Sequence, residues 1–140
     1  MPKDAQPERS FLQLQEIIGD GQDVGEITAW ISGSPAARAA FRVRTENLAK
    51  TNRAQWNKTQ FRKIEDDLHE IKWKADNLEW RAGGFDYQGF FVMVLGFTHK
   101  GKVYDPPDWK KTCLRRIKEV KNGRWKRIDF KHFKEEKPSQ

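Results

Sequence analysis

The chain has 140 residues, enough for one domain with a sizeable core. Its single cysteine excludes an internal disulfide and a cysteine-based zinc cage, and no apolar run reaches the ~20 residues that cross a membrane. The many Trp and Phe residues supply large apolar surfaces, so the low mean hydropathy of −0.92 reflects a charged exterior rather than disorder. We expect a cytoplasmic protein without a membrane partner.

The net charge of +7 is unevenly distributed along the chain. Of the 27 Lys and Arg residues, 12 follow residue 108, together with only 4 of the 20 Asp and Glu residues. A basic C-terminal part favours an anionic partner, of which nucleic acid is the commonest. The alternative is that a solvated helix and a charged tail simply carry lysines.

The N-terminal third predicts a strand and two helices. Residues 1–10 are polar and contain two prolines, which is typical of a disordered lead-in. Residues 11–18 are mostly apolar and predict a strand that ends at a Gly-Asp-Gly turn. A short helix is expected over 24–32, and the Ser-Pro pair at 34–35 predicts a second helix that runs to about residue 50.

The middle of the chain predicts a helical turn and then three strands. Residues 61–68 read as the helical turn. Residues 70–74 and 78–82 alternate apolar and polar side chains, and the residues between them form a plausible hairpin turn. Residues 90–97 are apolar on both faces, which is typical of a central strand covered on both sides.

Alternation gives the predicted hairpin one dry and one wet face. The dry face carries Ile71, Trp73, Leu78 and Trp80. The wet face carries Glu70, Lys72, Glu79 and Arg81. Two long cations on one open sheet surface, ahead of a turn rich in Lys and His, predict a site for a phosphate chain.

The C-terminal part predicts one helix. The Asp-Pro-Pro-Asp segment at 105–108 suits a helix start, and Asn122-Gly123 suits its C-terminal cap. Residues 125–130 are expected to pack back on the domain, and 131–140 form a charged tail. These elements predict an α+β fold with an antiparallel sheet of about four strands, helices on one face, an N-terminal helical hairpin and a C-terminal helix.

The order of elements and several short motifs resemble the RelE/ParE/HigB superfamily of bacterial and phage toxins. The strand before Gly-Asp-Gly, residues 26–31 and the Ser-Pro helix start are similar to that family's beginning. Residues 69–72 stand where the family has a Trp-Glu-Leu-Arg-like strand, and 79–81 stand at its Tyr-Arg strand. Residues 94–100 match its Leu-His-Gly-Phe-x-Lys-Lys-like strand and turn, and an Asp-Pro pair at 105–106 precedes the last helix as usual.

The resemblance covers about residues 11–122 and looks like the phage-derived HigB-like branch. On this basis we expect a RelE/HigB-like toxin domain at residues 11–130. The chain departs from the family in its long N-terminal lead, in the basic tail beyond Gly123, and in Lys72, which replaces Arg.

The resemblance implies the toxin of a type II toxin–antitoxin system that cuts mRNA on the ribosome. In this reaction a ribose 2′-OH attacks the neighbouring phosphodiester and leaves a cyclic phosphate, with a base, cations and an acid but no metal or other cofactor. An antitoxin, expected to carry a helix-turn-helix, would be the protein partner beside mRNA and the ribosome. Two alternatives stay open: a non-enzymatic RelE-fold module that binds RNA or a protein, and a ParE-like DNA gyrase inhibitor.

Within this resemblance three residues are candidate catalytic groups. Arg81 suits a bidentate phosphate clamp, Lys72 adds charge on the same face, and His99 supplies an imidazole for acid or base work. The candidate RNA-binding residues are Lys74, Tyr87, Lys100, Lys102 and Tyr104.

These residues also have plain structural readings. A histidine in a strand-end turn is usually a surface residue, and lysines beside Gly101 are ordinary turn residues. Trp73 and Trp80 read as core residues rather than base-stacking ones. Cys113 lies at helical spacing with apolar neighbours, which favours a buried core thiol over a nucleophile.

Overall fold

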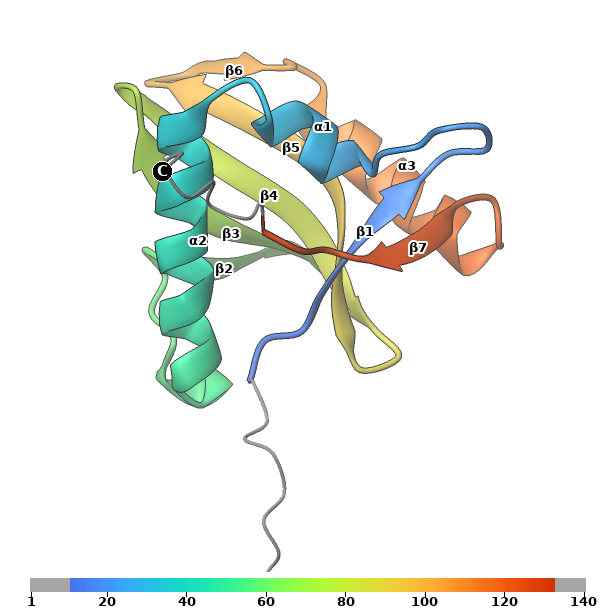
Figure 1. Ribbon diagram of the computed structural model, residues 1–140, viewed down its shortest axis with the longest axis horizontal. Coiled ribbons are helices and arrows are strands. Elements are labelled where there is room, and N and C mark those ends of the chain that lie inside the picture. The colour runs from blue at the N-terminus through green and yellow to red at the C-terminus, as the bar shows by residue number, and fades with distance from the viewer. Residues whose placement is uncertain (1–10, 133–140) are drawn as a thin grey trace, which may run out of the picture.

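A computed structural model describes residues 11–132, so the predicted lead-in at 1–10 and most of the predicted tail at 131–140 lie outside the described residues. The described chain forms a twisted seven-stranded sheet with helices on both faces (Figure 1). The strands are β1 (Leu14–Ile18), β2 (Phe61–Glu65), β3 (Leu68–Ala75), β4 (Leu78–Tyr87), β5 (Phe90–Lys100), β6 (Val103–Asp105) and β7 (Lys126–Asp129). The helices are α1 (Glu26–Ile31), α2 (Pro35–Lys50) and α3 (Trp109–Lys121), with a 3₁₀ turn η1 at Arg53–Gln55.

The strand order is β2-β3-β4-β5-β1-β7, and β6 pairs with the end of β5. Strands β2 to β5 form an antiparallel meander, whereas β1 runs parallel to β5 and β7 runs antiparallel to β1. The prediction that residues 90–97 form a central strand is confirmed, because β5 lies between β4 and β1 and buries side chains on both faces.

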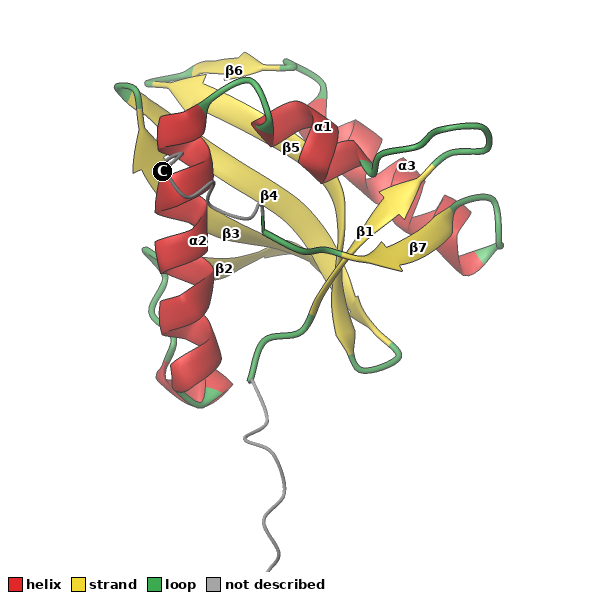
Figure 2. Cartoon of the chain, viewed as in Figure 1, coloured by secondary structure: helices red, strands yellow, loops and turns green. Residues whose placement is uncertain are grey.

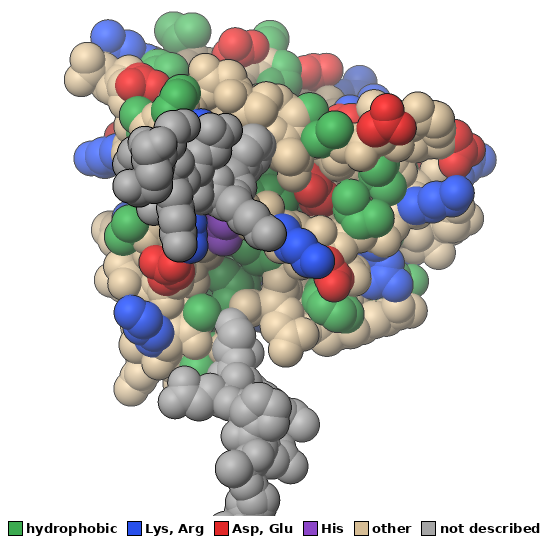
Figure 3. Space-filling model, in the orientation of Figure 1, with side chains coloured by type: hydrophobic (Ala, Val, Ile, Leu, Met, Phe, Trp, Pro, Cys, Tyr) green, Lys and Arg blue, Asp and Glu red, His purple; other side chains and the backbone are tan. Residues whose placement is uncertain are grey.

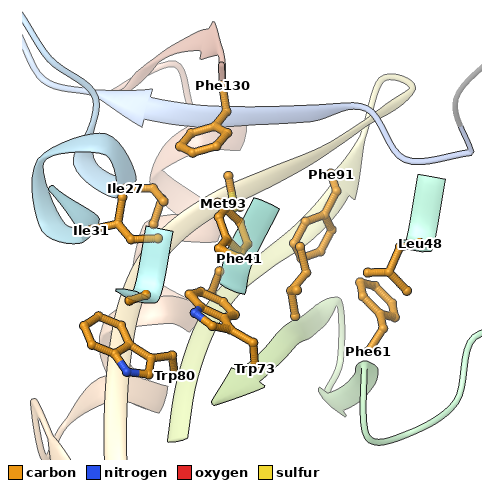
Figure 4. Packing of buried hydrophobic residues seen from close by; sticks show 13 residues of the cluster. Ile27, Ile31, Phe41, Leu48, Phe61, Trp73, Trp80, Phe91, Met93 and Phe130 are labelled. Carbon is orange, nitrogen blue, oxygen red and sulfur yellow. The ribbon is translucent and has the colours of Figure 1, made fainter. Parts of the chain in front are cut away.

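Figure 2 shows helices on both faces of the sheet, and one hydrophobic core lies on each face. Helices α1 and α2 cover the first core, whose large side chains are drawn in Figure 4: Ile27, Ile31, Phe41, Leu48, Phe61, Trp73, Trp80, Phe91, Met93 and Phe130. Helix α3 covers the second core, which is built around Ile17, Leu68, Phe85, Val92, Val94, Phe97, Cys113, Ile117 and Val120.

The predicted four-stranded sheet with helices on one face and an N-terminal helical hairpin is wrong. The sheet has seven strands, and α3 lies on the face opposite α1 and α2. The two N-terminal helices do not pair as a hairpin, because α1 packs on β5 and β1 while α2 packs on β3. Each helix thus buries its apolar side against the sheet rather than against the other helix.

The three additional strands are short and lie at the periphery of the sheet. The helical turn expected at 61–68 is instead strand β2 and the turn into β3, where Asp66 adopts a left-handed φ of 52°. Strand β6 adds to the end of β5, and β7 forms from the segment expected only to pack back on the domain. Each has three to five residues, too few for a clear period-two pattern.

The turns and helix caps that the sequence predicts from local residues are present in the structure. Asp76 and Asn77 join β3 to β4 with φ of 53° and 60°, the geometry of a two-residue hairpin turn. Ser34 caps α2 by accepting from the Ala37 amide at 3.1 Å, and Pro35 is its first residue. Gly123 follows the end of α3 with φ of 76°.

One extra residue on β5 shifts the pairing between β4 and β5. Gly83 pairs with Leu95, but the next residue, Gly84, pairs with Met93, so Val94 has no partner on β4. Gly84 is required here because a Cβ would lie 2.3 Å from the Val92 carbonyl oxygen. Beyond this bulge the odd-numbered residues of β5 face α3, whereas before it they face α1 and α2.

Helix α1 is fixed by a buried carboxylate. Glu16 on β1 is 2 % exposed and accepts from the amides of Ile27 and Thr28, each at 2.8 Å, and from the Thr28 hydroxyl at 2.5 Å. These amides belong to the first turn of α1, whose N–H groups lack partners within the helix. Glu16 therefore ties α1 to the sheet.

Candidate functional site

The candidate site lies at the C-terminal ends of β3 and β5 and the N-terminal end of β4, at the end of the sheet where β6 pairs with β5 (Figure 1). Lys72 pairs with Arg81 across β3 and β4, and Lys74 pairs with Glu79. Side chains paired in this way share one face of the sheet, here the α3 face, because Ile71, Trp73 and Trp80 are buried on the other. The structure therefore brings together Lys72, Lys74 and Arg81, which the alternation places on one face.

His99 joins the same face because of the β5 bulge. It pairs with Glu79, and its Nε2 lies 2.8 Å from Nη2 of Arg81. Counting alternate residues from Met93, which faces α1 and α2, would place His99 on that opposite face. The extra residue at Val94 reverses which side chains of β5 face α3, and it therefore places the His99 imidazole beside Arg81.

Arg81 is buried among acceptors. Its side chain is 7 % exposed, with Nε 3.4 Å from Oε1 of Glu70 and Nη1 3.2 Å from Oε1 of Glu79. Glu70 is buried as well and also accepts two hydrogen bonds from Arg62, of 2.6 and 3.0 Å. The expectation that Arg81 and Glu70 lie on a wet face is wrong: this face is polar, but these two side chains form a buried charge network on it.

The hydrogen bonds of His99 define its tautomer. Arg81 can only donate, so Nε2 of His99 accepts from it. The carbonyl oxygen of Gly101 can only accept, so Nδ1 of His99, 3.0 Å away, carries the proton. In this arrangement the lone pair of Nε2 points to the guanidinium of Arg81.

Lys72 and Arg44 bring two further charges to this region. The Lys72 ammonium donates to the carbonyl oxygen of Lys58 at 3.1 Å. The backbone carbonyl oxygen of Lys72 accepts from Nε of Arg44 at 2.7 Å. Burial, followed by the charges of Arg81 and Arg62, lowers the pKa of Lys72, and burial lowers the pKa of Arg44. We call Arg44, Lys72, Lys74 and Arg81 the cation cluster.

The cation cluster lines one cavity of ≈ 510 Å³. Its remaining walls are Ala40 and Val43 of α2, Thr59 of the loop before β2, Trp73 and Glu79. The volume falls within the range of small-molecule and nucleotide sites. Four cations and one carboxylate around an open cavity favour an anionic ligand such as a phosphodiester.

Aromatic rings support His99 from one side. The rings of His99 and Tyr104 stack with centroids 4.5 Å apart, and Tyr104 in turn stacks on Trp109 at 5.5 Å. Trp109 also stacks on Phe97 at 4.2 Å. Tyr104, expected to bind RNA, thus supports the imidazole at the start of α3.

The other predicted RNA-binding residues lie outside the cavity. Lys100 and Lys102 are exposed in the turn after His99. Tyr87 lies at the opposite end of β4, six residues from Arg81 and therefore roughly 20 Å along the strand. The structure does not bring Tyr87 to the cation cluster.

Several residues of the site were missed from the sequence. Glu79 shares the alternating face of Arg81, so the sequence does contain a signal that could place it in the site. Arg44 lies within the helix predicted to run to about residue 50, and no local pattern indicates that it reaches β3. The prediction for Cys113 is confirmed: the thiol is buried, and burial raises its pKa to about 12.

Surface charge alone does not locate a site. On the face drawn in Figure 3, Lys and Arg side chains are scattered among acidic and apolar ones. Across residues 11–132, no three His, Cys, Asp or Glu side chains are grouped so that they could hold a metal ion. In the same residues, no helix combines the length and apolar character needed to span a membrane.

Comparison with known proteins gives no assignment: no protein-family model, no curated protein and no solved structure matches the chain.

Proposed function

We propose that this protein is an RNA endonuclease, the toxin of a type II toxin–antitoxin system acting on ribosome-bound mRNA. The observation that supports cleavage is the contact of Arg81 with His99. Arg81 and Lys72 line the cavity, and His99 lies against Arg81 outside that lining. The toxin role rests on the sequence resemblance. An antitoxin is the partner that this proposal requires.

The geometry supports a substrate-triggered mechanism. A phosphodiester in the cavity would replace His99 as the acceptor for Nη2 of Arg81, which frees the Nε2 lone pair. Nε2 then takes the proton of the 2′-OH as the 2′ oxygen bonds to phosphorus. Arg81 stabilises the phosphorane, and the bond to the 5′ oxygen breaks. Lys72, whose pKa is lowered, donates the proton to that leaving oxygen.

A non-enzymatic RNA-binding module is the second candidate. It is favoured by the engagement of the Arg81 guanidinium with Glu70, Glu79 and His99. If phosphate cannot displace His99 from Arg81, RNA would bind Lys74 and Arg44 without being cut. The two candidates differ in one measurable property, the formation of cleaved product.

The test for cleavage uses purified protein with a labelled RNA, with and without ribosomes. We expect a 2′,3′-cyclic phosphate product, and no cut at a linkage whose 5′-side ribose is 2′-deoxy, because that sugar lacks the nucleophile. His99→Gln should lower the rate by about 10²–10⁴, the usual range for losing a general base. Glutamine can still accept from Arg81, so the fold is retained.

The matched control is Lys63→Gln, which removes an exposed cation of β2 outside the cavity. It should leave the cleavage rate unchanged. Cleavage by folded His99→Gln at the wild-type rate would exclude His99 as the base. Binding of RNA without any product would exclude the endonuclease and leave the binding module.

The cellular test is expression without a partner. We expect growth arrest with early loss of methionine incorporation, since translation is the proposed target. Early loss of thymidine incorporation would instead indicate gyrase inhibition. Normal growth with confirmed folded protein would contradict the toxin role.

A further inference from the structure

A second charged groove is lined by residues from the C-terminal end of α3 and from β7. Figure 1 shows these two elements close together. It encloses ≈ 550 Å³ and is lined by Lys121, Lys126 and Arg127 together with the rings of Tyr87 and Trp125. We propose that this groove is a separate binding site for single-stranded RNA. The inference rests on the proposed function in one respect only, that RNA is the ligand the protein handles.

The groove has an excess of positive charge. None of its described lining residues is Asp or Glu. Lys121 pairs with Asp67 at 2.7 Å, and Lys126 lies 4.0 Å from Asp20, but both pairs are exposed and therefore weak. Within the described chain, Arg127 donates to the neutral side-chain oxygens of Gln15 at 3.0 Å and Gln88 at 2.5 Å. Its charge thus stays available to a phosphate.

Two aromatic rings are held in place beside these cations. The Arg127 guanidinium lies 5.0 Å from the centre of the Tyr87 ring, which stacks on buried Phe85. The Trp125 indole donates to Glu119 at 3.0 Å and lies under the guanidinium of Arg116 at 5.1 Å. Both rings remain partly exposed, so a base can stack on an indole or on a guanidinium plane.

This combination favours a single strand over other anions. A duplex keeps its bases stacked inside, so it would use the cations but offer no base to the partly exposed rings. An acidic peptide would likewise meet the charges but has no planar base. The groove is also separate from the cation cluster, because Tyr87 and Arg81 stand roughly 20 Å apart on β4.

The probe is a labelled hexamer of 2′-O-methyluridine, which cannot supply the attacking hydroxyl and is therefore not cut. Binding to the full chain is followed by fluorescence anisotropy over a range of salt. Arg127→Gln should weaken binding on the order of tenfold and reduce the salt slope by about one. Lys63→Gln is the charge-matched control and should change neither the affinity nor the structure.

An abasic oligomer of the same length separates stacking from charge. Wild-type protein and Lys63→Gln should both prefer the base-bearing hexamer, whereas Trp125→Leu should lose that preference. Arg127→Gln protein that keeps its thermal transition and binds like wild type would overturn the proposal. Equal binding of the abasic oligomer by wild type, or equal competition by polyglutamate, would overturn it too.

The outcome is independent of cleavage. Loss of hexamer binding in Arg127→Gln, together with no cleavage by wild type, would refute the endonuclease but retain this site. Cleavage by wild type with unchanged hexamer binding in Arg127→Gln would refute this site alone.

Discussion

At the scale of single residues, Arg81 combines a structural and a proposed chemical role. Its removal by Arg81→Ala takes one of two ion-pair partners from buried Glu70 and leaves Arg62 as the other, so the free energy of unfolding should fall by about 3 kcal/mol. An exposed arginine would cost within about 1 kcal/mol. Urea titration followed by Trp fluorescence measures this difference.

Arg81→Lys separates the two roles. Lysine keeps a positive charge for Glu70 but cannot reproduce the planar fork, so the stability loss should be smaller while cleavage still falls by about 10²–10³. A stable Arg81→Lys variant that cuts RNA at the wild-type rate would contradict the proposal that Arg81 clamps the phosphate through two hydrogen bonds.

His132 gives the folded protein a pH dependence. Its Nε2 contacts the Thr45 hydroxyl at 2.8 Å and its ring packs against Phe41 and Phe130. Burial, followed by the charge of Arg42, lowers the pKa of His132. Below about pH 6.5 the unfolded chain therefore binds a proton that the folded chain resists, and stability falls as pH falls through the lowered pKa.

The measurement is the free energy of unfolding at pH 7.5 and 5.5 for wild type and His132→Gln. Carboxylates titrate in both proteins, so the difference between their two losses isolates the histidine. The wild type should lose more stability than the variant. Equal losses would show that His132 takes no part.

At the scale of elements, α1 depends on one side chain from another element. Glu16→Gln replaces a carboxylate that holds three donors, and charged hydrogen bonds contribute about 1.5–3 kcal/mol. We expect a loss of stability in that range and faster amide exchange in Ile27 and Thr28. Glu46→Gln, in an exposed pair with Arg42 on α2, should cost within about 0.5 kcal/mol.

The predictable elements were those with local causes. Ser34 and Pro35 start α2, and the alternation of β3 and β4 follows from their own residues. The partners of β1 and β7 were not predictable, because pairing of distant strands leaves no local pattern. The same holds for the site: the alternation indicated Lys72 beside Arg81, whereas Arg44 and the engagement of Arg81 by His99 depend on tertiary packing.

At the scale of the whole molecule, the C-terminal segment belongs to the fold. Strand β7 pairs with β1, and Phe130 is buried in the first core. Truncation after Gly123 would therefore unfold the domain rather than only remove charge. Phe130→Ala should cost about 3–5 kcal/mol, while Ile128→Ala, an exposed change on β7, should cost far less. Calorimetric melting of both variants checks this, and equal losses would contradict it.

Because Val94 has no partner on β4, the geometry of the site depends on the number of residues in β5 more than on their identity. Deleting Val94 would restore an uninterrupted two-residue repeat and rotate every later side chain of the strand by half a turn. Phe97 would leave α3, and the imidazole of His99 would be directed among tryptophans. A scan of point substitutions retains this spacing, but the loss of a single codon removes it. Nitrogen-15 shifts of His99 in a folded deletion variant should lack the signature of an Nε2 that accepts from arginine.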